Sequence, residues 1–145
     1  MKRPAQVRPA AQRDTAALAA LMAHLGYPTD AGTMGARMER VTALPGYAAW
    51  VAESDGEVIG MVGAMIGWPF VYDTPYARIL ALVVDPGHRG RGAGAAMVRT
   101  VEEWARTHGA SSLHLTAGNQ RTDAHLFYSR VGFDDNGKRF FKRLD

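Results

Sequence analysis

Hydrophobic residues recur at helical spacing in four stretches of the chain. In the first, Leu18, Leu21, Met22 and Leu25 fall at i, i+3, i+4 and i+7, which places them on one helix face. Asp14 precedes this stretch and is expected to cap its helix. The same spacing recurs further along the chain and predicts helices over about 15–25, 31–44, 92–107 and 122–131.

Glycine marks the expected end of three of these helices. Gly26, Gly109 and Gly132 each follow a periodic stretch. Glycine is favoured just past a helix because it adopts a left-handed backbone without strain. The 31–44 stretch ends instead at Pro45, which cannot continue a helix.

The remaining apolar runs are short, and they alternate or are continuous, as in strands. They predict strands near Val7, over 47–53, 57–66, 77–84 and 113–117, and two more within 133–144. Asp55-Gly56 separates the second and third strands and predicts a tight hairpin. This order of elements indicates one mixed α/β domain spanning 1–145.

Composition supports a folded single domain and excludes several classes of protein. The chain has 145 residues, of which 47% are hydrophobic and 21% charged, enough to form one core. There is no cysteine, which excludes a disulfide framework and a thiolate metal site. The longest uncharged stretch, 58–72, is too short for a membrane span, and no signal peptide is recognisable, so we expect no membrane partner and a cytoplasmic location. A net charge of +3 favours an anionic ligand.

A glycine-rich segment joins the 77–84 strand to the following helix. Gly90, Gly92 and Gly94 stand at alternate positions, so backbone N–H groups can approach a ligand together with the positive end of the helix. Arg89 and Arg91 add charged donors that suit phosphate oxygens. The segment therefore predicts a phosphate-binding loop, and the alternative is a tight turn with solvated arginines.

Other phosphate-binding motifs fit the segment less well. No Walker sequence is present, which argues against hydrolysis of a nucleoside triphosphate. Gly90, Gly92 and Ala95 satisfy the loose dinucleotide pattern, but the acidic residue that should follow about 20 positions later is absent from 110–118. A dinucleotide site is therefore only a minor alternative.

The loop sequence Arg89-Gly90-Arg91-Gly92-Ala93-Gly94 resembles the signature of the GNAT superfamily of acyl-CoA-dependent N-acetyltransferases. The 82–86 segment is similar to that family's fourth strand and bulge, and 124–133 to its late Ala-x-x-x-Tyr-x-x-x-Gly-Phe helix. The resemblance covers nearly the whole chain. It implies one N-acetyltransferase domain with a mixed, mostly antiparallel sheet of six to seven strands. About four helices should flank this sheet, which should be splayed between strands 4 and 5.

The resemblance also implies an activity and a set of site residues. The expected reaction is acetyl transfer from acetyl-CoA to a primary amine of a small molecule or peptide, by direct attack in a ternary complex. The family's Asn is replaced by Arg121, so Asn119 or Arg121 would have to substitute for it. The residues expected to hold acetyl-CoA are Leu82, Val83, Val84, Arg89, Gly90, Arg91, Gly92, Ala93, Gly94, Ala95, Asn119 and Arg121.

Tyr128 matches the family's general acid. A tyrosine with a pKa of about 10 stays protonated at neutral pH and can donate to a departing thiolate, whose thiol has a pKa of about 8.5. The alternative role is core packing beside Phe127. The general base stays open among Glu53, Asp73, His114 and His125. The five histidines show no metal-ligand spacing, so no metal is expected.

The amine acceptor should bind between the first two helices, their connection at 26–32 and the aromatic loop at 67–76, because these segments face the thioester end in the resembling fold. A homodimer is possible for this family, and the acceptor itself stays open. A non-catalytic module that senses coenzyme A is the main alternative. RNA binding is the least favoured, because no aromatic sheet motif accompanies the basic residues.

Overall fold

A computed structural model describes residues 4–116 and 122–144, which belong to two compact units divided after His114. The first unit contains β1 (Gln6–Pro9), a 3-10 turn (Gln12–Asp14), α1 (Thr15–Leu25), α2 (Ala31–Thr42), β2 (Tyr47–Ser54), β3 (Glu57–Gly67), β4 (Tyr76–Val84), a second 3-10 turn (Pro86–His88), α3 (Ala93–Thr107) and β5 (Leu113–His114). In the second unit, the described element is α4 (Thr122–Arg130).

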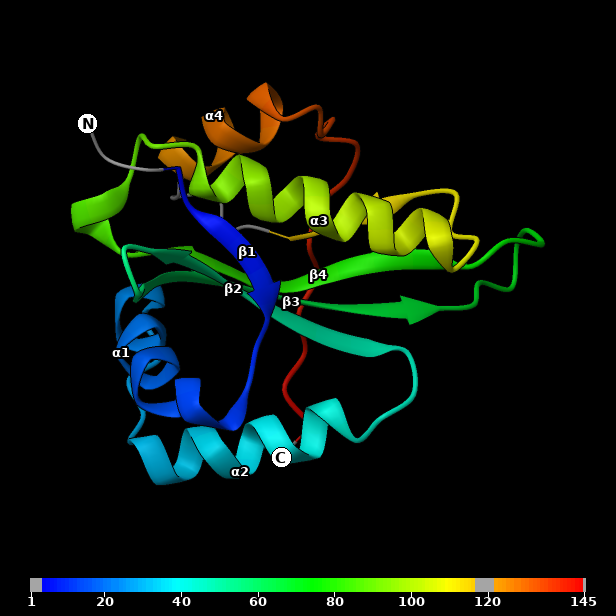
Figure 1. The fold of residues 1–145 in the computed structure, drawn as a ribbon. Coiled ribbons are helices and arrows are strands. Elements are labelled where there is room, and N and C mark those ends of the chain that lie inside the picture. Colours follow the sequence, from blue (N-terminus) through cyan, green and yellow to red (C-terminus); the bar gives the residue numbers. More distant parts are fainter. Residues whose placement is uncertain (1–3, 117–121, 145) are drawn as a thin grey trace. The chain divides into compact units, whose positions relative to one another are not determined.

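The sheet has the order β1-β2-β3-β4-β5, antiparallel throughout except for the parallel pair β4–β5. The helices α1 and α2 cover one face of the sheet and α3 covers the other (Figure 1). The expected mixed, mostly antiparallel sheet and four α-helices are therefore confirmed.

The expectation of six to seven strands is wrong for the described residues, which contain five. The two missing strands were expected within 133–144, where the structure has no regular element. Asp135-Asn136-Gly137 is a good turn sequence, but a turn supplies no hydrogen-bonded neighbour. A lone two-stranded hairpin is marginal without a further strand or a helix against it.

Two apolar layers hold the first unit together. On one face, α1 and α2 bury Leu18, Leu21, Met22, Met34 and Met38 against the sheet residues Val51, Met61 and Val83. On the other face, α3 packs closely over Gly60, where an added Cβ would lie 3.0 Å from both the Met97 methyl group and the Val83 carbonyl oxygen. A larger residue at position 60 would push α3 off the sheet.

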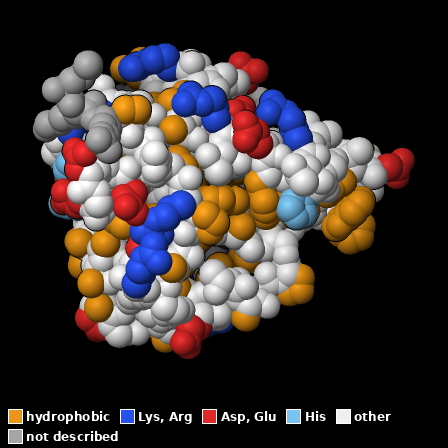
Figure 2. All heavy atoms as spheres, viewed as in Figure 1, with side chains coloured by type: hydrophobic (Ala, Val, Ile, Leu, Met, Phe, Trp, Pro, Cys, Tyr) orange, Lys and Arg blue, Asp and Glu red, His pale blue; other side chains and the backbone are white. Residues whose placement is uncertain are grey.

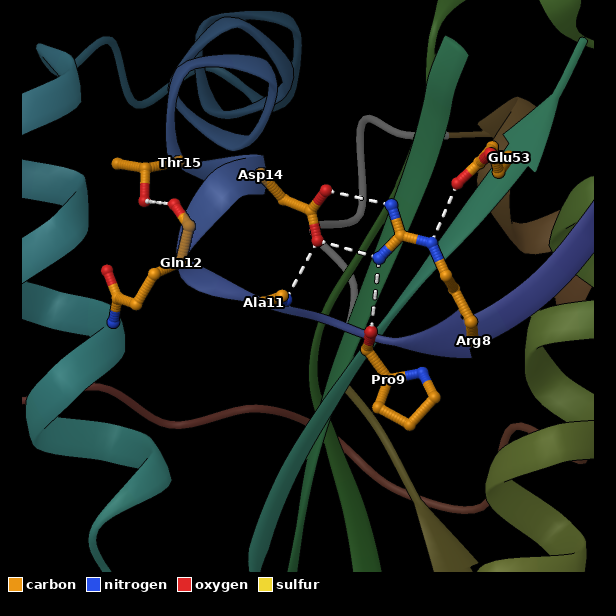
Figure 3. Close-up of polar contacts among 7 residues, drawn as sticks. All are labelled: Arg8, Pro9, Ala11, Gln12, Asp14, Thr15 and Glu53. Atoms are coloured by element: carbon orange, nitrogen blue, oxygen red, sulfur yellow. Dashed lines mark hydrogen bonds and ion pairs between the residues drawn. The ribbon is translucent and has the colours of Figure 1, made fainter. Parts of the chain in front are cut away.

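Asp14 does not cap α1 as the sequence predicts. Its side chain makes no capping bond to that helix. The carboxylate instead accepts two hydrogen bonds of 2.9 Å from the Arg8 guanidinium and one of 2.8 Å from the Ala11 N–H (Figure 3). Arg8 Nε also donates to Glu53 at 2.7 Å. Two charge-assisted bonds to one guanidinium are stronger than a single capping bond, so Arg8 rather than the helix end binds the carboxylate. This partly buried pair ties β1 and β2 to the start of α1.

Three helices end at the glycines that the sequence predicts. Gly26, Gly109 and Gly132 have φ of 103°, 82° and 98°, in the left-handed region. At each one, the N–H of the following residue bonds to a carbonyl five residues back, as in Tyr27 to Met22 at 2.9 Å. This is the Schellman arrangement, which satisfies carbonyl groups that a helix end otherwise leaves free.

Candidate anion-binding site

The segment between β4 and α3 is held open by local hydrogen bonds. Asp85 Oδ1 accepts the Gly87 N–H at 2.8 Å, and the Asp85 carbonyl accepts the His88 N–H at 2.9 Å. Gly90 and Gly92 then take positive φ values of 80° and 82°. An added Cβ at either glycine would meet no atom within 4 Å, so the space in front of this backbone is free.

The first turn of α3 begins directly at this loop. Gly92 is the N-cap, and the N–H groups of Ala93, Gly94 and Ala95 follow it. N–H groups in a first helical turn have no acceptor within the helix, and they lie at the positive end of the helix dipole. Arg89 and Arg91 are exposed beside them. The sequence-predicted loop residues are thus brought together in a geometry that suits an anion such as a phosphate.

The edge of β4 that leads into this loop has only a short strand partner in the part of the chain that the structure describes. There β5 pairs with Ala77 and Arg78 alone, and the expected splay between the two strands stays a prediction. Leu82, Val83 and Val84 lie beyond this pairing on β4. On that side, the described residues provide no strand partner for the backbone groups of 82–84.

The bulge of β4 falls earlier than the sequence resemblance indicates. Gly63 pairs with Ala81 and Ala64 with Ile79, which leaves Leu80 as the extra residue. The 82–86 segment itself keeps regular pairing up to Val84. A bulge bends a strand and turns a side chain away from the ladder, and Leu80 is accordingly 49% exposed.

An open cavity of about 720 Å³ lies beside this bulge. It is lined by Met22 and Leu25 of α1, Gly26, Tyr27 and Pro28 of the connection, Arg37 of α2, and Leu80 and Ala81 of β4. The first two helices and their connection are therefore at a cavity, as expected for an acceptor pocket. The volume is in the range of small-molecule sites.

The aromatic loop between β3 and β4 does not contribute to that lining. Trp68, Phe70 and Tyr72 are exposed, with Phe70 fully so. Figure 2 shows hydrophobic side chains gathered at the end of the sheet from which this loop projects. Tyr76 packs instead on Gly67 and lies edge-on to the His114 ring at 5.3 Å.

The structure separates the candidate bases. Glu53 lies on β2 and is bound to Arg8, at a smaller polar cavity of about 430 Å³ near β1. One strand, β3, lies between β2 and β4, so Glu53 is not on the strand that leads into the glycine loop. His114 bonds to Ser112 at 2.9 Å, and Asp73 is exposed in the aromatic loop. His125 belongs to the second unit.

Asp85 is a charged residue at the start of the loop that was not among the expected site residues. The Gly87 N–H, and more weakly the nearby His24 and His88, hold the pKa of its carboxyl below the usual value. His88 Nδ1 lies 3.7 Å from Asp85 Oδ1. The carboxylate is therefore ionised at neutral pH and fixes the turn that opens the loop.

Tyr128 lies on α4, within the second unit. Its ring is edge-on to Phe127 and Phe133, with centroids 5.6 and 6.0 Å apart. The Phe133 N–H bonds to the Tyr128 carbonyl at 2.9 Å, so the contact with Phe133 is part of the helix-ending motif at Gly132. The expected ligands Asn119 and Arg121 lie outside the described residues.

No group of three or more metal-ligating side chains occurs among the residues that the structure describes. No helix among them has the length and apolarity to cross a membrane.

Comparison with known proteins identifies the family. Residues 16–133 match the model of the acetyltransferase (GNAT) family. The chain is 39% identical over 101 residues to human N-acetyltransferase 8, an alignment that covers 66% of this chain and 42% of that protein. The chain therefore belongs to the GNAT acetyltransferase family, which confirms the family expected from the motifs. It matches less than half the length of that relative.

Solved structures share the fold. A GNAT family acetyltransferase from Staphylococcus aureus has a TM-score of 0.83 at 24% identity, covering 98% of this chain and all of its own. The aminoglycoside N-acetyltransferase AAC(6')-Iy, solved in complex with CoA, has a TM-score of 0.88 at 19% identity, covering 99% and 96% of the two chains. At these identities the likeness extends to the fold and not to the substrate.

Proposed function

We propose that the chain is an N-acetyltransferase that moves an acetyl group from acetyl-CoA to a primary amine by direct attack in a ternary complex. The observation that carries the proposal is the continuity of three features in the first unit. The open glycine loop at the start of α3 follows the part of β4 beyond its pairing with β5, and the cavity at Leu80 and Ala81 adjoins that same strand. In the proposal they serve as an anion site, a strand edge for the ligand and a small-molecule pocket.

The loop and the strand suit the two halves of acetyl-CoA, which supplies the acyl thioester. The pyrophosphate would be held by Arg89, Gly90, Arg91 and the N–H groups from Gly92 to Ala95. The amides of the pantetheine arm would pair with the β4 edge at Leu82, Val83 and Val84. Asn119 or Arg121 is proposed as a further contact from its place in the motif.

In the proposed reaction, the nitrogen of a neutral amine forms a bond to the thioester carbonyl carbon. A backbone N–H near Val83 would stabilise the resulting oxyanion. The carbon–sulfur bond then breaks, and the departing thiolate takes a proton from Tyr128. The surplus proton on the acetylated nitrogen passes to a base or to water, and a proton from the same source restores the Tyr128 phenol. The role of Tyr128 rests on its place in the 124–133 motif.

Replacing Tyr128 with Phe tests this assignment. The change removes one hydroxyl and keeps the ring contacts with Phe127 and Phe133. If Tyr128 is the general acid, kcat should fall by about 10²- to 10⁴-fold with little change in affinity for acetyl-CoA. The measurement is amine-dependent release of CoA thiol, with thermal unfolding as the control. A kcat within about twofold at unchanged stability would make Tyr128 a packing residue.

The same assay separates an enzyme from a coenzyme A sensor. A sensor would bind acetyl-CoA at the loop and release no thiol with any amine. An acetyltransferase would release thiol and form an equal amount of acetylated amine, which mass spectrometry detects. Binding without turnover across amines of varied charge and size would favour the sensor.

A further inference from the structure

The cavity beside β4 carries a charge pattern that bears on the acceptor. Seven of its lining residues are aliphatic, aromatic, glycine or proline: Met22, Leu25, Gly26, Tyr27, Pro28, Leu80 and Ala81. Of the described residues that line it, Arg37 alone is charged. Arg37 lies on α2, on the same face of the sheet as α1 (Figure 1).

The Arg37 guanidinium has no counter-ion in the part of the chain that the structure describes. No hydrogen bond or ion pair joins it to a described residue. Arg8 shows the contrast, since its guanidinium is bound to Asp14 and Glu53. Arg37 is exposed at the open mouth of the cavity, so its guanidinium can reach an anion that lies on the apolar lining.

From this arrangement we infer that the amine acceptor is a small apolar molecule that also carries a carboxylate, which pairs with Arg37. The inference rests on the proposed acetyl transfer and names its substrate class. A carboxylate matches the guanidinium fork with two parallel hydrogen bonds. The apolar body would lie on Met22, Leu25 and Leu80.

Charge balance disfavours the other acceptor classes. A phosphate monoester carries about −1.5 to −2 charges at neutral pH, so one arginine would leave part of that charge unpaired in an apolar pocket. A polyamine would place further positive charge beside Arg37. An apolar amine with a single carboxylate leaves no such unpaired negative charge and places no such further positive charge beside Arg37.

Matched amines test the inference. Phenylalanine and leucine are compared with 2-phenylethylamine and isoamylamine, which lack only the carboxylate, and with spermidine and O-phosphoethanolamine. The enzymes are the wild type, Arg37→Gln, Arg37→Glu and the control Arg40→Gln. Arg40 is also exposed on α2 and does not line the cavity. For each matched pair, the measured quantity is the ratio of kcat/KM for the carboxylated amine to kcat/KM for the amine without the carboxylate. Intrinsic differences in amine reactivity cancel when this ratio is compared between enzymes.

We expect the wild type to prefer the carboxylated amines. Arg37→Gln should lower kcat/KM for them by about 10- to 100-fold, mainly through KM, and change the neutral amines by less than about threefold. Arg37→Glu should invert the preference in favour of spermidine, while Arg40→Gln should behave as the wild type. Acetyl-CoA affinity and thermal unfolding should be the same in all four proteins.

Two kinds of failure are distinguishable. Thiol release with neutral amines, spermidine or phosphoethanolamine at least equal to that with the amino acids would overturn the acceptor class and leave acetyl transfer intact. So would a ratio that Arg37→Gln leaves unchanged. If no amine in the panel or in a wider screen releases thiol while acetyl-CoA binds, acetyl transfer itself fails, and the acceptor class with it.

Discussion

Arg8 shows how one side chain can organise the start of the first unit. Its guanidinium makes bonds of 2.9, 2.9 and 2.7 Å to Asp14 and Glu53. Asp14 is 4% exposed, whereas Glu53 is 32% exposed. Burial raises the cost of leaving a polar partner unpaired, so the Asp14 half of this network should matter more for stability.

Replacing Asp14 with Asn should lower the free energy of unfolding by about 1–3 kcal/mol, because Arg8 loses its bidentate charged partner. Glu53→Gln is the matched control and should cost less than about 1 kcal/mol, since that pair is more exposed and makes one bond. Urea unfolding measures both. Equal losses would mean that burial of Asp14 contributes nothing to the pair.

The same network predicts how the free energy of unfolding changes at acid pH. Hydrogen bonds from Arg8 hold the pKa of the Asp14 carboxyl below its usual value. The unfolded chain therefore binds this proton at higher pH than the folded protein, and stability falls as pH drops below about 4. In Asp14→Asn this pH dependence should be weaker, so the difference in free energy of unfolding between the variant and the wild type should become smaller as the pH falls. Urea midpoints between pH 7 and 3 check this, and a constant difference would contradict it.

At the scale of elements, the helix ends follow from local sequence. A Schellman ending needs a residue that tolerates positive φ and an apolar pair across the turn, and both are visible in a short window such as Met22 to Tyr27. The hairpin is equally local: Asp55 and Gly56 have φ of 51° and 79°, as a type I′ turn requires. Such features can be predicted from sequence because no distant segment competes for them.

Gly26 links an element boundary to the cavity. Its φ of 103° directs the chain into Tyr27 and Pro28, which line the cavity. Gly26→Ala should destabilise the protein by about 1–2 kcal/mol, because alanine is strained at this φ. Gly63→Ala is the control, since its φ is not in the left-handed region and an added Cβ meets nothing within 4 Å. Thermal unfolding compares them, and equal stabilities would contradict the strain argument.

Features that depend on distant partners were not predictable from the sequence. Asp14 is a reasonable cap by local rules, but its carboxylate is bound by Arg8, six residues earlier, and the Arg8 guanidinium is in turn bound by Glu53 on the neighbouring strand. The bulge at Leu80 depends on its register with Gly63 and Ala64. In the sequence Arg37 is one more exposed cation of an amphipathic helix, and only the fold brings it to the same cavity as Leu80 and Ala81 of β4.

At the scale of the whole molecule, one part of the site was predictable from the sequence and another part was not. The glycine loop was predictable because its glycines, arginines and helix start are contiguous in sequence. The acceptor cavity combines α1, α2 and β4, which no local pattern joins. The anion site is thus encoded locally, whereas the acceptor pocket arises only from the packed fold.

Ligand binding at the loop should stabilise the folded chain by mass action. CoA at about 100 times its Kd should add roughly 2.7 kcal/mol, which for a chain of this size raises Tm by about 5–10 °C. Gly92→Glu should abolish the shift, because the new carboxylate would occupy the space that an anion needs. Arg99→Ala, an exposed change further along α3, should retain it. Differential scanning fluorimetry with and without CoA measures all three proteins. Because glutamate at position 92 is also strained by the φ of 82°, the comparison uses the shift on adding CoA and not the absolute Tm. A full shift in folded Gly92→Glu would place the CoA site away from the start of α3.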